Sequence, residues 1–217
     1  MPAEYSELEE VRMVITEILE RNARRYGDDV ALIEINPDHR EVRRTWKEYE
    51  LIESQGDRPY RSEITWYVFN EKANRFANLL LGSGVRKGDK IGILMMNCLE
   101  WLPVYFGVLK TGALAVPMNF RYTSEEIRYC ANLADVDILV FGPEFIGRIE
   151  EIAEELRCRL LYCGPGLTPS FAFNYAELTA NCSSKSPEIP LSLEQDAAIY
   201  FSSGTTGFPK AILHNHG

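Results

Sequence analysis

The fold is decided by Lys90-Ile-Gly-Ile-Leu-Met95, by the segment from Leu99 to Lys110, and by Leu114-Ala-Val-Pro117. The first and third are apolar runs of strand length, and the second has the length and spacing of an amphipathic helix. A helix between two strands is a crossover too long for a hairpin, so we expect the strands to be parallel neighbours. This stretch therefore predicts a β-α-β unit in a buried sheet.

The same alternation continues toward the C-terminus. We expect a helix over Ser124–Ala134, where Thr123 and Glu126 have the spacing of a capping box. The other expected elements are a strand at Ile138–Phe141, a helix at Glu144–Leu156 and a strand at Leu160–Cys163. Repeated crossovers predict a layered α/β fold, with a largely parallel sheet and helices on both faces.

The segment before Lys90 is expected to hold two helices and short strands. Apolar residues repeat at helical spacing from Val11 to Tyr26, before the stop signal of Gly27. Further expected elements are a strand at Val30–Ile35, a turn at Asn36–His39, a return strand at Glu41–Trp46 and a strand at Ile64–Trp66. A second helix is expected to follow this last strand and to end at Gly82 or Gly84. Its core face is expected at Phe69, Ala73, Phe76, Ala77 and Leu80. The stretch Lys47–Ser62 has no clear pattern.

Composition narrows the classes of function. The 217 residues are 46% hydrophobic and 25% charged, which suits one large or two small globular domains. The net charge of −9 and the lack of a basic run argue against a nucleic-acid partner. The apolar runs are shorter than the roughly 20 residues that cross a bilayer, and the acidic start does not resemble a secretion signal. We therefore expect a cytoplasmic protein with no membrane span.

The cysteines and histidines give no complete metal site. The five cysteines are scattered and include no Cys-x-x-Cys pair, which argues against a disulfide framework and a zinc site. His214 and His216 have the spacing of paired ligands on one face of a strand, but no third ligand is near. No metal site is expected in this chain.

A stretch rich in serine and proline, Ser183–Pro190, is the best linker candidate. It predicts an N-terminal α/β subdomain at 1–182 and a linker at 183–195. Residues 196–217 would then begin the next subdomain, with a hairpin loop.

The strongest chemical signal is Ser202-Ser-Gly-Thr-Thr-Gly-Phe-Pro-Lys210. Gly204 and Gly207 allow turns that expose backbone N–H groups, and Lys210 adds a mobile positive charge. Hydroxyl donors are present on Ser202, Ser203, Thr205 and Thr206. This is not a Walker sequence, because Ala211 follows the lysine in place of the Ser or Thr that would hold magnesium. The residues alone leave phosphate binding and a hairpin loop without a ligand equally open.

This nine-residue stretch resembles the signature phosphate loop of the adenylate-forming superfamily, which includes acyl-CoA and aryl-CoA synthetases, luciferases and peptide-synthetase adenylation domains. With Phe201 and His214, it is most similar to the medium-chain acyl-CoA and aryl-CoA members. Four further segments resemble other motifs of the family and occur in the same order: Ile64–Trp66, Gly84–Lys90, Asn97–Trp101 and Leu109–Asn119. The departures are Ala211, where many members have glycine, and the added stretch Lys47–Ser62.

The resemblance implies an ATP-dependent acyl-CoA synthetase that uses ATP, Mg²⁺ and coenzyme A. A small-molecule carboxylate attacks the α-phosphate of ATP to give an acyl-adenylate, and the thiol of coenzyme A then displaces AMP. In such enzymes the loop holds the β- and γ-phosphates, a role that falls to Ser202, Ser203, Gly204, Thr205, Thr206, Gly207 and Lys210. By the same resemblance, His214 lines the acyl pocket.

Members of the superfamily are more than twice as long as this chain. We therefore expect an N-terminal fragment that has no synthetase activity on its own. A shortened sheet would also expose edges that favour a homodimer. Two other interpretations remain open: a fragment of an amino-acid adenylation domain, and a non-catalytic, stand-alone binding or regulatory protein.

Overall fold

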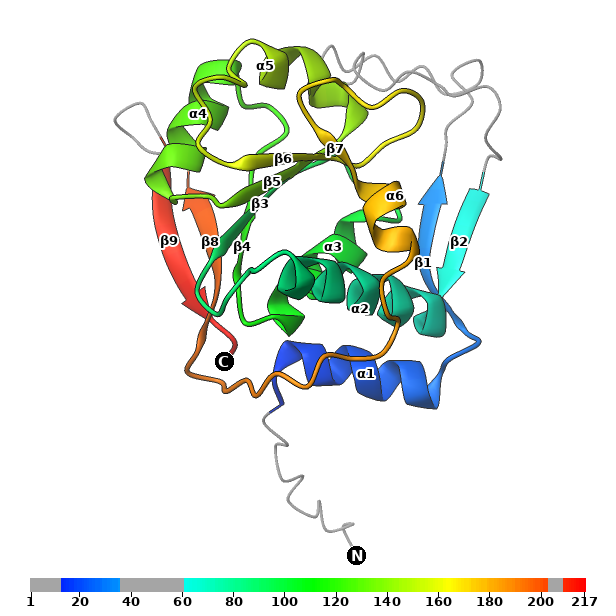
Figure 1. The fold of residues 1–217 in the computed structure, drawn as a ribbon. Coiled ribbons are helices and arrows are strands. Elements are labelled where there is room, and N and C mark those ends of the chain that lie inside the picture. Colours follow the sequence, from blue (N-terminus) through cyan, green and yellow to red (C-terminus); the bar gives the residue numbers. More distant parts are fainter. Residues whose placement is uncertain (1–12, 36–60, 203–208) are drawn as a thin grey trace, which may run out of the picture.

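The computed structural model describes residues 13–35, 61–202 and 209–217. Its main feature is a seven-stranded sheet in the order β7-β6-β5-β3-β4-β8-β9 (Figure 1). The strands are β3 (Lys90–Leu94), β4 (Leu114–Pro117), β5 (Ile138–Phe141), β6 (Arg159–Tyr162), β7 (Phe173–Asn174), β8 (Asp196–Ser202) and β9 (Lys210–Asn215). Neighbouring strands are parallel, except that β8 and β9 pair antiparallel. The largely parallel sheet that the crossovers predict is confirmed.

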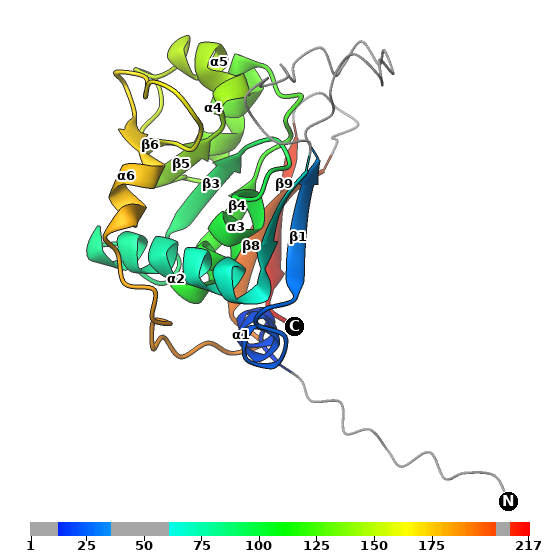
Figure 2. The same cartoon turned by 90° about the vertical axis from the view of Figure 1, so that its right-hand side faces the viewer.

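Helices cover both faces of this sheet. They are α1 (Ile15–Arg25), α2 (Trp66–Gly82), α3 (Trp101–Lys110), α4 (Ser124–Leu133), the 3-10 helix η1 (Pro143–Phe145), α5 (Ile146–Glu150) and α6 (Tyr175–Ala180). Helices α2, α3 and α6 pack on one face, and α4 and α5 pack on the other (Figure 1, Figure 2). The fold is therefore the layered α/β class expected from the sequence.

The strands are apolar on both sides because both faces of the sheet are buried. Ile91 and Ile93 of β3 pack with α2 and α3, whereas Leu94 packs with α4. Helices α2 and α3 approach each other closely at Gly107. A Cβ atom there would lie 2.9 Å from the carbonyl oxygen of Ala73 and 2.9 Å from a ring carbon of Phe76.

A smaller unit lies against the outer side of α2. Strands β1 (Val30–Ile35) and β2 (Arg61–Thr65) form an antiparallel ribbon, and residues of α1, α2, α3 and the ribbon share a buried cluster. The predicted strand at Val30–Ile35 is confirmed. The turn at Asn36–His39, the return strand at Glu41–Trp46 and most of Lys47–Ser62 lie outside the described residues.

Three predicted helices have clearly different boundaries in the structure. The helix expected to begin at Leu99 begins at Trp101. Helix α1 begins at Ile15, because Val14 is extended and its N–H donates to the carboxylate of Glu17 at 3.1 Å. The helix expected to reach Leu156 ends at Glu150 and is followed by turns. In these turns the N–H of Ile152 bonds to the carbonyl of residue 149, an i→i+3 bond in place of the α-helical one.

Two elements were not predicted, β7 and the short helix α6. Strand β7 has two residues, which is too short for a detectable alternation of side chains. Helix α6 carries a local signal, because the side chain of Asn174 accepts a hydrogen bond from the backbone N–H of Glu177 at 3.0 Å. Such an N-cap is readable from sequence.

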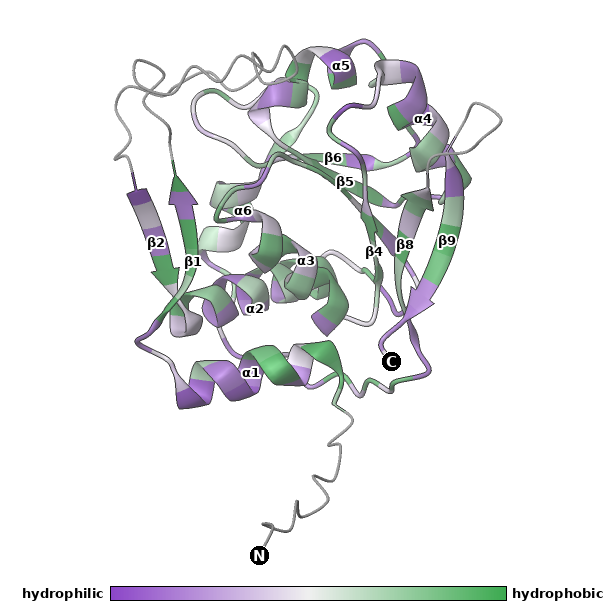
Figure 3. Ribbon diagram, turned by 180° about the vertical axis from the view of Figure 1, so that it is seen from behind, coloured by the Kyte–Doolittle hydropathy of each residue, from purple (hydrophilic) through white to green (hydrophobic). Residues whose placement is uncertain are grey.

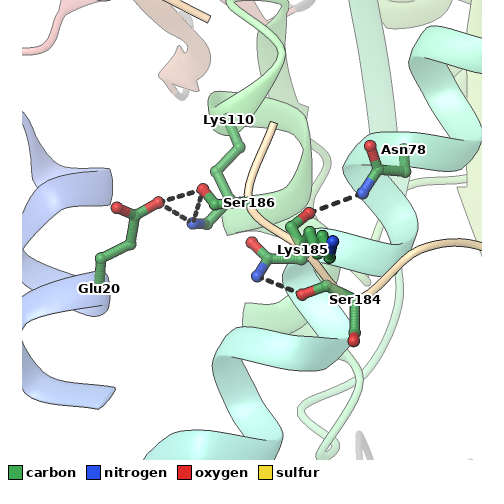
Figure 4. A network of polar contacts seen from close by, with 7 residues as sticks. Glu20, Asn78, Lys110, Ser184, Lys185 and Ser186 are labelled. Carbon is green, nitrogen blue, oxygen red and sulfur yellow. Dashed lines mark hydrogen bonds and ion pairs between the residues drawn. The ribbon is translucent and has the colours of Figure 1, made fainter. Parts of the chain in front are cut away.

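Residues 183–187, here called the strap, cross over α2 (Figure 4). The side-chain amides of Asn74 and Asn78 donate hydrogen bonds of 2.8 Å to the carbonyl oxygens of three strap residues. Residues 183–195 contain neither helix nor strand, and the following strand β8 joins β4 in the main sheet. The division into subdomains at 1–182 and 196–217 stays a prediction.

The strap is also tied to α1 and α3 through Lys110. Its ammonium lies 2.5 Å from the carboxylate of Glu20 and 3.4 Å from the hydroxyl of Ser186, which itself donates to Glu20 (Figure 4). Burial opposes ionisation of Glu20, but the bonds from Lys110 and Ser186 outweigh burial and lower the pKa of the carboxyl. Burial lowers the pKa of Lys110, and Glu20 offsets part of this change.

Candidate functional site

The predicted phosphate loop connects β8 to β9. Ser202, the last residue of β8, pairs with Lys210, the first residue of β9, so the two ends of the loop meet. Strand β8 is parallel to β4, and the loop therefore leaves the sheet at its carboxyl edge, where open α/β sheets bind ligands. The predicted site residues Ser203, Gly204, Thr205, Thr206 and Gly207 lie outside the described residues.

The described site residues share one face of the hairpin. Directly paired residues lie on the same face of a sheet, as do residues two apart on a strand. The pairs on this surface, here called the hairpin face, are Ser202 with Lys210, Tyr200 with Ile212, and Ala198 with His214. Ile199 and Phe201 point the other way and pack toward α4, so the hairpin face is on the side of α3.

An aromatic row extends the hairpin face toward α3. The rings of His214 and Tyr200 meet edge to face, with centroids 5.1 Å apart and planes at 81°. The hydroxyls of Tyr200 and Tyr105 are 2.7 Å apart, within hydrogen-bond distance. Tyr105 stacks on Trp101 with ring centroids 5.5 Å apart. Burial and the bond to Tyr200 raise the pKa of Tyr105, so its phenol is neutral at physiological pH.

The sequence pattern identified only one member of this row, His214. Tyr200 lies two residues before Ser202, and the period of a strand therefore places both side chains on one face. That signal was readable from the sequence. No comparable signal marked Tyr105, because its contact with Tyr200 joins residues that are 95 positions apart.

His214 and His216 do not form the paired arrangement that their spacing suggests. Strand β9 ends at Asn215, so His216 lies beyond it, with its backbone N–H bonded to the carbonyl of Gln195 at 3.0 Å. Both ring nitrogens of His216 are buried without a hydrogen-bond partner, and burial lowers the pKa of the ring. Within residues 13–35, 61–202 and 209–217, no three His, Cys, Asp or Glu side chains are grouped so that they could hold a metal ion.

The motif Leu109–Asn119 supports the start of β8. It spans the end of α3, a tight turn and β4, and Gly112 in the turn has a φ of +77°. The side-chain amide of Gln195 donates to the carbonyl of Gly112 at 3.3 Å. Gln195 directly precedes β8, so this motif helps to position the strand that leads into the predicted phosphate loop.

Strand β9 lies at one edge of the seven-stranded sheet, and among the described residues no further strand pairs with it. All of its residues are exposed, including Ile212 at 45% and Leu213 at 55%. The middle of the strand is coloured as hydrophobic in Figure 3. An apolar edge strand with unpaired backbone groups is a surface that proteins normally cover.

Comparisons with known proteins identify the family of the chain. Residues 19–217 match the family described as AMP-binding enzyme. The chain belongs to this family. No helix among the described residues has both the length and the apolar character needed to cross a bilayer.

Two similar relatives are named as CoA ligases. A medium/long-chain-fatty-acid–CoA/3-oxocholest-4-en-26-oate–CoA ligase of Mycolicibacterium smegmatis is 31% identical over 71% of this chain and 29% of its own length. A crotonobetaine/carnitine–CoA ligase of Salmonella heidelberg is 32% identical over 71% of this chain and 31% of its own length. The chain thus spans about a third or less of these relatives.

Solved structures show the same fold. An anthranilate CoA ligase, AuaEII, in complex with anthranoyl-AMP matches with a TM-score of 0.75 and 27% identity over 93% of this chain and 34% of the ligase. The N-terminal domain of FACL13 from Mycobacterium tuberculosis matches with a TM-score of 0.70 and 23% identity over 94% of this chain and 45% of that domain. The chain corresponds to the N-terminal portion of such ligases.

Proposed function

We propose that the whole protein is an ATP-dependent acyl-CoA synthetase and that this chain supplies its phosphate loop. A carboxylate oxygen bonds to the α-phosphorus of ATP, and pyrophosphate leaves. The sulfur of coenzyme A then bonds to the carbonyl carbon, and AMP leaves. The observation that carries this proposal is the pairing of Ser202 with Lys210, which brings both ends of the loop together at the carboxyl edge of the sheet.

The donor set fits the phosphates of ATP. Lys210 is exposed at the loop exit, where its ammonium can neutralise the departing pyrophosphate, and Ser202 can donate its hydroxyl to a phosphate oxygen. Further hydroxyl and amide donors come from Ser203, Gly204, Thr205, Thr206 and Gly207. Residues 202–210 contain no carboxylate, so in this proposal Mg²⁺ binds the phosphate oxygens of ATP and adds charge neutralisation there.

The acyl group would lie along the hairpin face. Ser202 and Lys210 mark its phosphate end, and His214 lies four strand positions from Lys210, a distance of about 13 Å in an extended strand. Tyr200 and Ile212 lie between them. The substrate is thus a carboxylic acid whose apolar or aromatic part contacts this surface.

The experiment is pyrophosphate exchange into ATP by the full-length protein, measured with a panel of carboxylic acids. Lys210→Ala should lower the exchange rate by about 100- to 1000-fold, the range for removing a positioned donor at a developing charge. The matched control is Lys185→Ala, because Lys185 is an exposed lysine on the strap. Unchanged exchange in Lys210→Ala would contradict the proposal, as would an equal loss in the control.

We also propose that residues 1–217 alone have no synthetase activity and form a cytoplasmic homodimer through the exposed edge β9. The relatives that are named ligases are about three times longer than the segment matched here. Measurable acyl-CoA formation by residues 1–217 would contradict the first statement. A monomer in sedimentation experiments would contradict the second.

A further inference from the structure

The proposed phosphate site does not include Tyr200 or Tyr105. Tyr200 nevertheless lies on the hairpin face that ends at Ser202 and Lys210, and the hydroxyl of Tyr105 is within hydrogen-bond distance of its hydroxyl. We propose that this hydroxyl-bonded tyrosine pair closes the acyl site on the side of α3 and thereby limits the length of the carboxylic acid that is accepted. The inference rests on the proposed function and names its substrate class: acids with a short or medium aliphatic chain or a single aromatic ring.

The first argument is position. An acid whose carboxylate meets the phosphates near Ser202 and Lys210 continues along the hairpin face. The next pair on that face is Tyr200 with Ile212, about 7 Å further along the strands. Both side chains are accessible, at 38% and 45% exposure. Tyr200 and Ile212 are therefore the first large apolar side chains that the acid meets.

The second argument is rigidity. The side chain of Tyr200 is held at two points. Its ring centroid lies 5.1 Å from that of His214, and its hydroxyl lies 2.7 Å from the hydroxyl of Tyr105. Tyr105 is in turn fixed on α3 by stacking on Trp101 and by an edge contact with Phe106 at 6.0 Å. A side chain that is held in this way can exclude a longer acid, because moving it would break a hydrogen bond and ring contacts.

The third argument is the space beyond the pair. Trp101, the end of the aromatic row, lines a cavity of about 500 Å³ between the start of α3 and strand β1. Leu32, Leu99 and Leu102 contribute to its lining. Trp101 is the member of the row that lines this space, and Tyr105 stacks on it. In this inference, removing a tyrosine ring gives a longer acid room on the side of α3.

The experiment compares kcat/KM for dodecanoate and hexanoate in the full-length protein. One methylene that an apolar pocket accepts or rejects changes kcat/KM by about 10- to 200-fold. Tyr200→Ala should therefore raise the ratio of dodecanoate to hexanoate by about tenfold or more. Tyr200→Trp should lower it, because the larger ring shortens the site. Tyr105→Phe keeps the ring and removes the bond to Tyr200, so it should raise the ratio by less than Tyr200→Ala does.

The control is Tyr67→Ala, at a tyrosine of α2 that is 56% exposed, and it should leave the ratio unchanged. Opposite changes in Tyr200→Ala and Tyr200→Trp support the inference, since a merely structural role predicts losses for all acids in both. An unchanged ratio, or an equal loss for both acids, overturns it. The proposed function fails separately, if Lys210→Ala keeps full pyrophosphate exchange or if the unsubstituted protein adenylates no acid.

Discussion

Lys110 offers the sharpest test of how this fold is held together. Its side chain is only 2% exposed and contacts Glu20, which is 28% exposed, at 2.5 Å. Through Glu20 and Ser186 it joins α3, α1 and the strap. Lys110→Ala would leave the half-buried carboxylate of Glu20 without its cation and the hydroxyl of Ser186 without one of its partners.

The cost follows from the burial of each partner. Removing one member of a buried ion pair costs about 3–5 kcal/mol. Water can reach Glu20, so we expect a loss of about 2–3 kcal/mol for Lys110→Ala. In Lys110→Met combined with Glu20→Gln, both charges are removed while most of the side-chain volume remains. This double variant should lose less than Lys110→Met alone, because no unpaired charge is left.

The assay is amide hydrogen exchange in the full-length protein, followed in peptides from α1 and the strap. A loss of 2–3 kcal/mol corresponds to exchange that is about 30- to 150-fold faster. The pKa of Glu20 is lowered in the fold, so its contribution is present at neutral pH and is lost as the pH falls through that lowered pKa. The reasoning would be refuted if exchange in Lys110→Ala were less than about threefold faster than in the unsubstituted protein. It would also be refuted if the double variant were less stable than Lys110→Met.

Two further predictions concern the core. Gly107→Ala should destabilise the fold by about 1–3 kcal/mol, since its Cβ would lie 2.9 Å from both the carbonyl oxygen of Ala73 and the ring of Phe76. Gly147→Ala is the control, because its Cβ would meet nothing within 4 Å, and equal melting temperatures for the two variants would contradict the close approach of α2 and α3. Burial raises the pKa of Cys158 from 9.0 to about 11, so alkylation by iodoacetamide should be slow at pH 8 and should speed up toward pH 11. The thiol of the unfolded chain ionises at a lower pH than the folded one, so Cys158 makes the fold less stable as the pH rises from 9.0 to about 11. Rapid alkylation of Cys158 in the folded protein at pH 8 would contradict its burial.

Much of the sheet was predictable because local and global signals agree. The apolar runs at β3, β4 and β5 are near-continuous, as expected for strands that are buried on both faces. Helix α4 begins where Thr123 and Glu126 predict it, and the hydroxyl of Thr123 accepts a hydrogen bond from the N–H of Glu126 at 3.3 Å. Here the cap and the apolar face specify the same helix.

The end of α5 shows what periodicity does not report. Ile149, Ile152 and Leu156 are all buried, at the spacing that predicted a longer helix. After Glu150 the chain forms turns that still bury these side chains. Burial of one face does not require α-helical hydrogen bonds. The predicted helix therefore spans these buried residues, but its predicted end at Leu156 is wrong.

The site depends on register, which the sequence did not supply. The alternation of side chains along a strand puts Tyr200 and Ser202 on one face of β8, and separately puts Lys210 and His214 on one face of β9. Only the pairing of Ser202 with Lys210 puts the two sets on one face, and only the place of β8 beside β4 turns that face toward α3. A shift of one residue would move Lys210 and His214 to the side of α4 and away from Tyr105. The proposed phosphate contact and the proposed limit on acid length therefore depend on a single register, and a variant that changes the register should alter both.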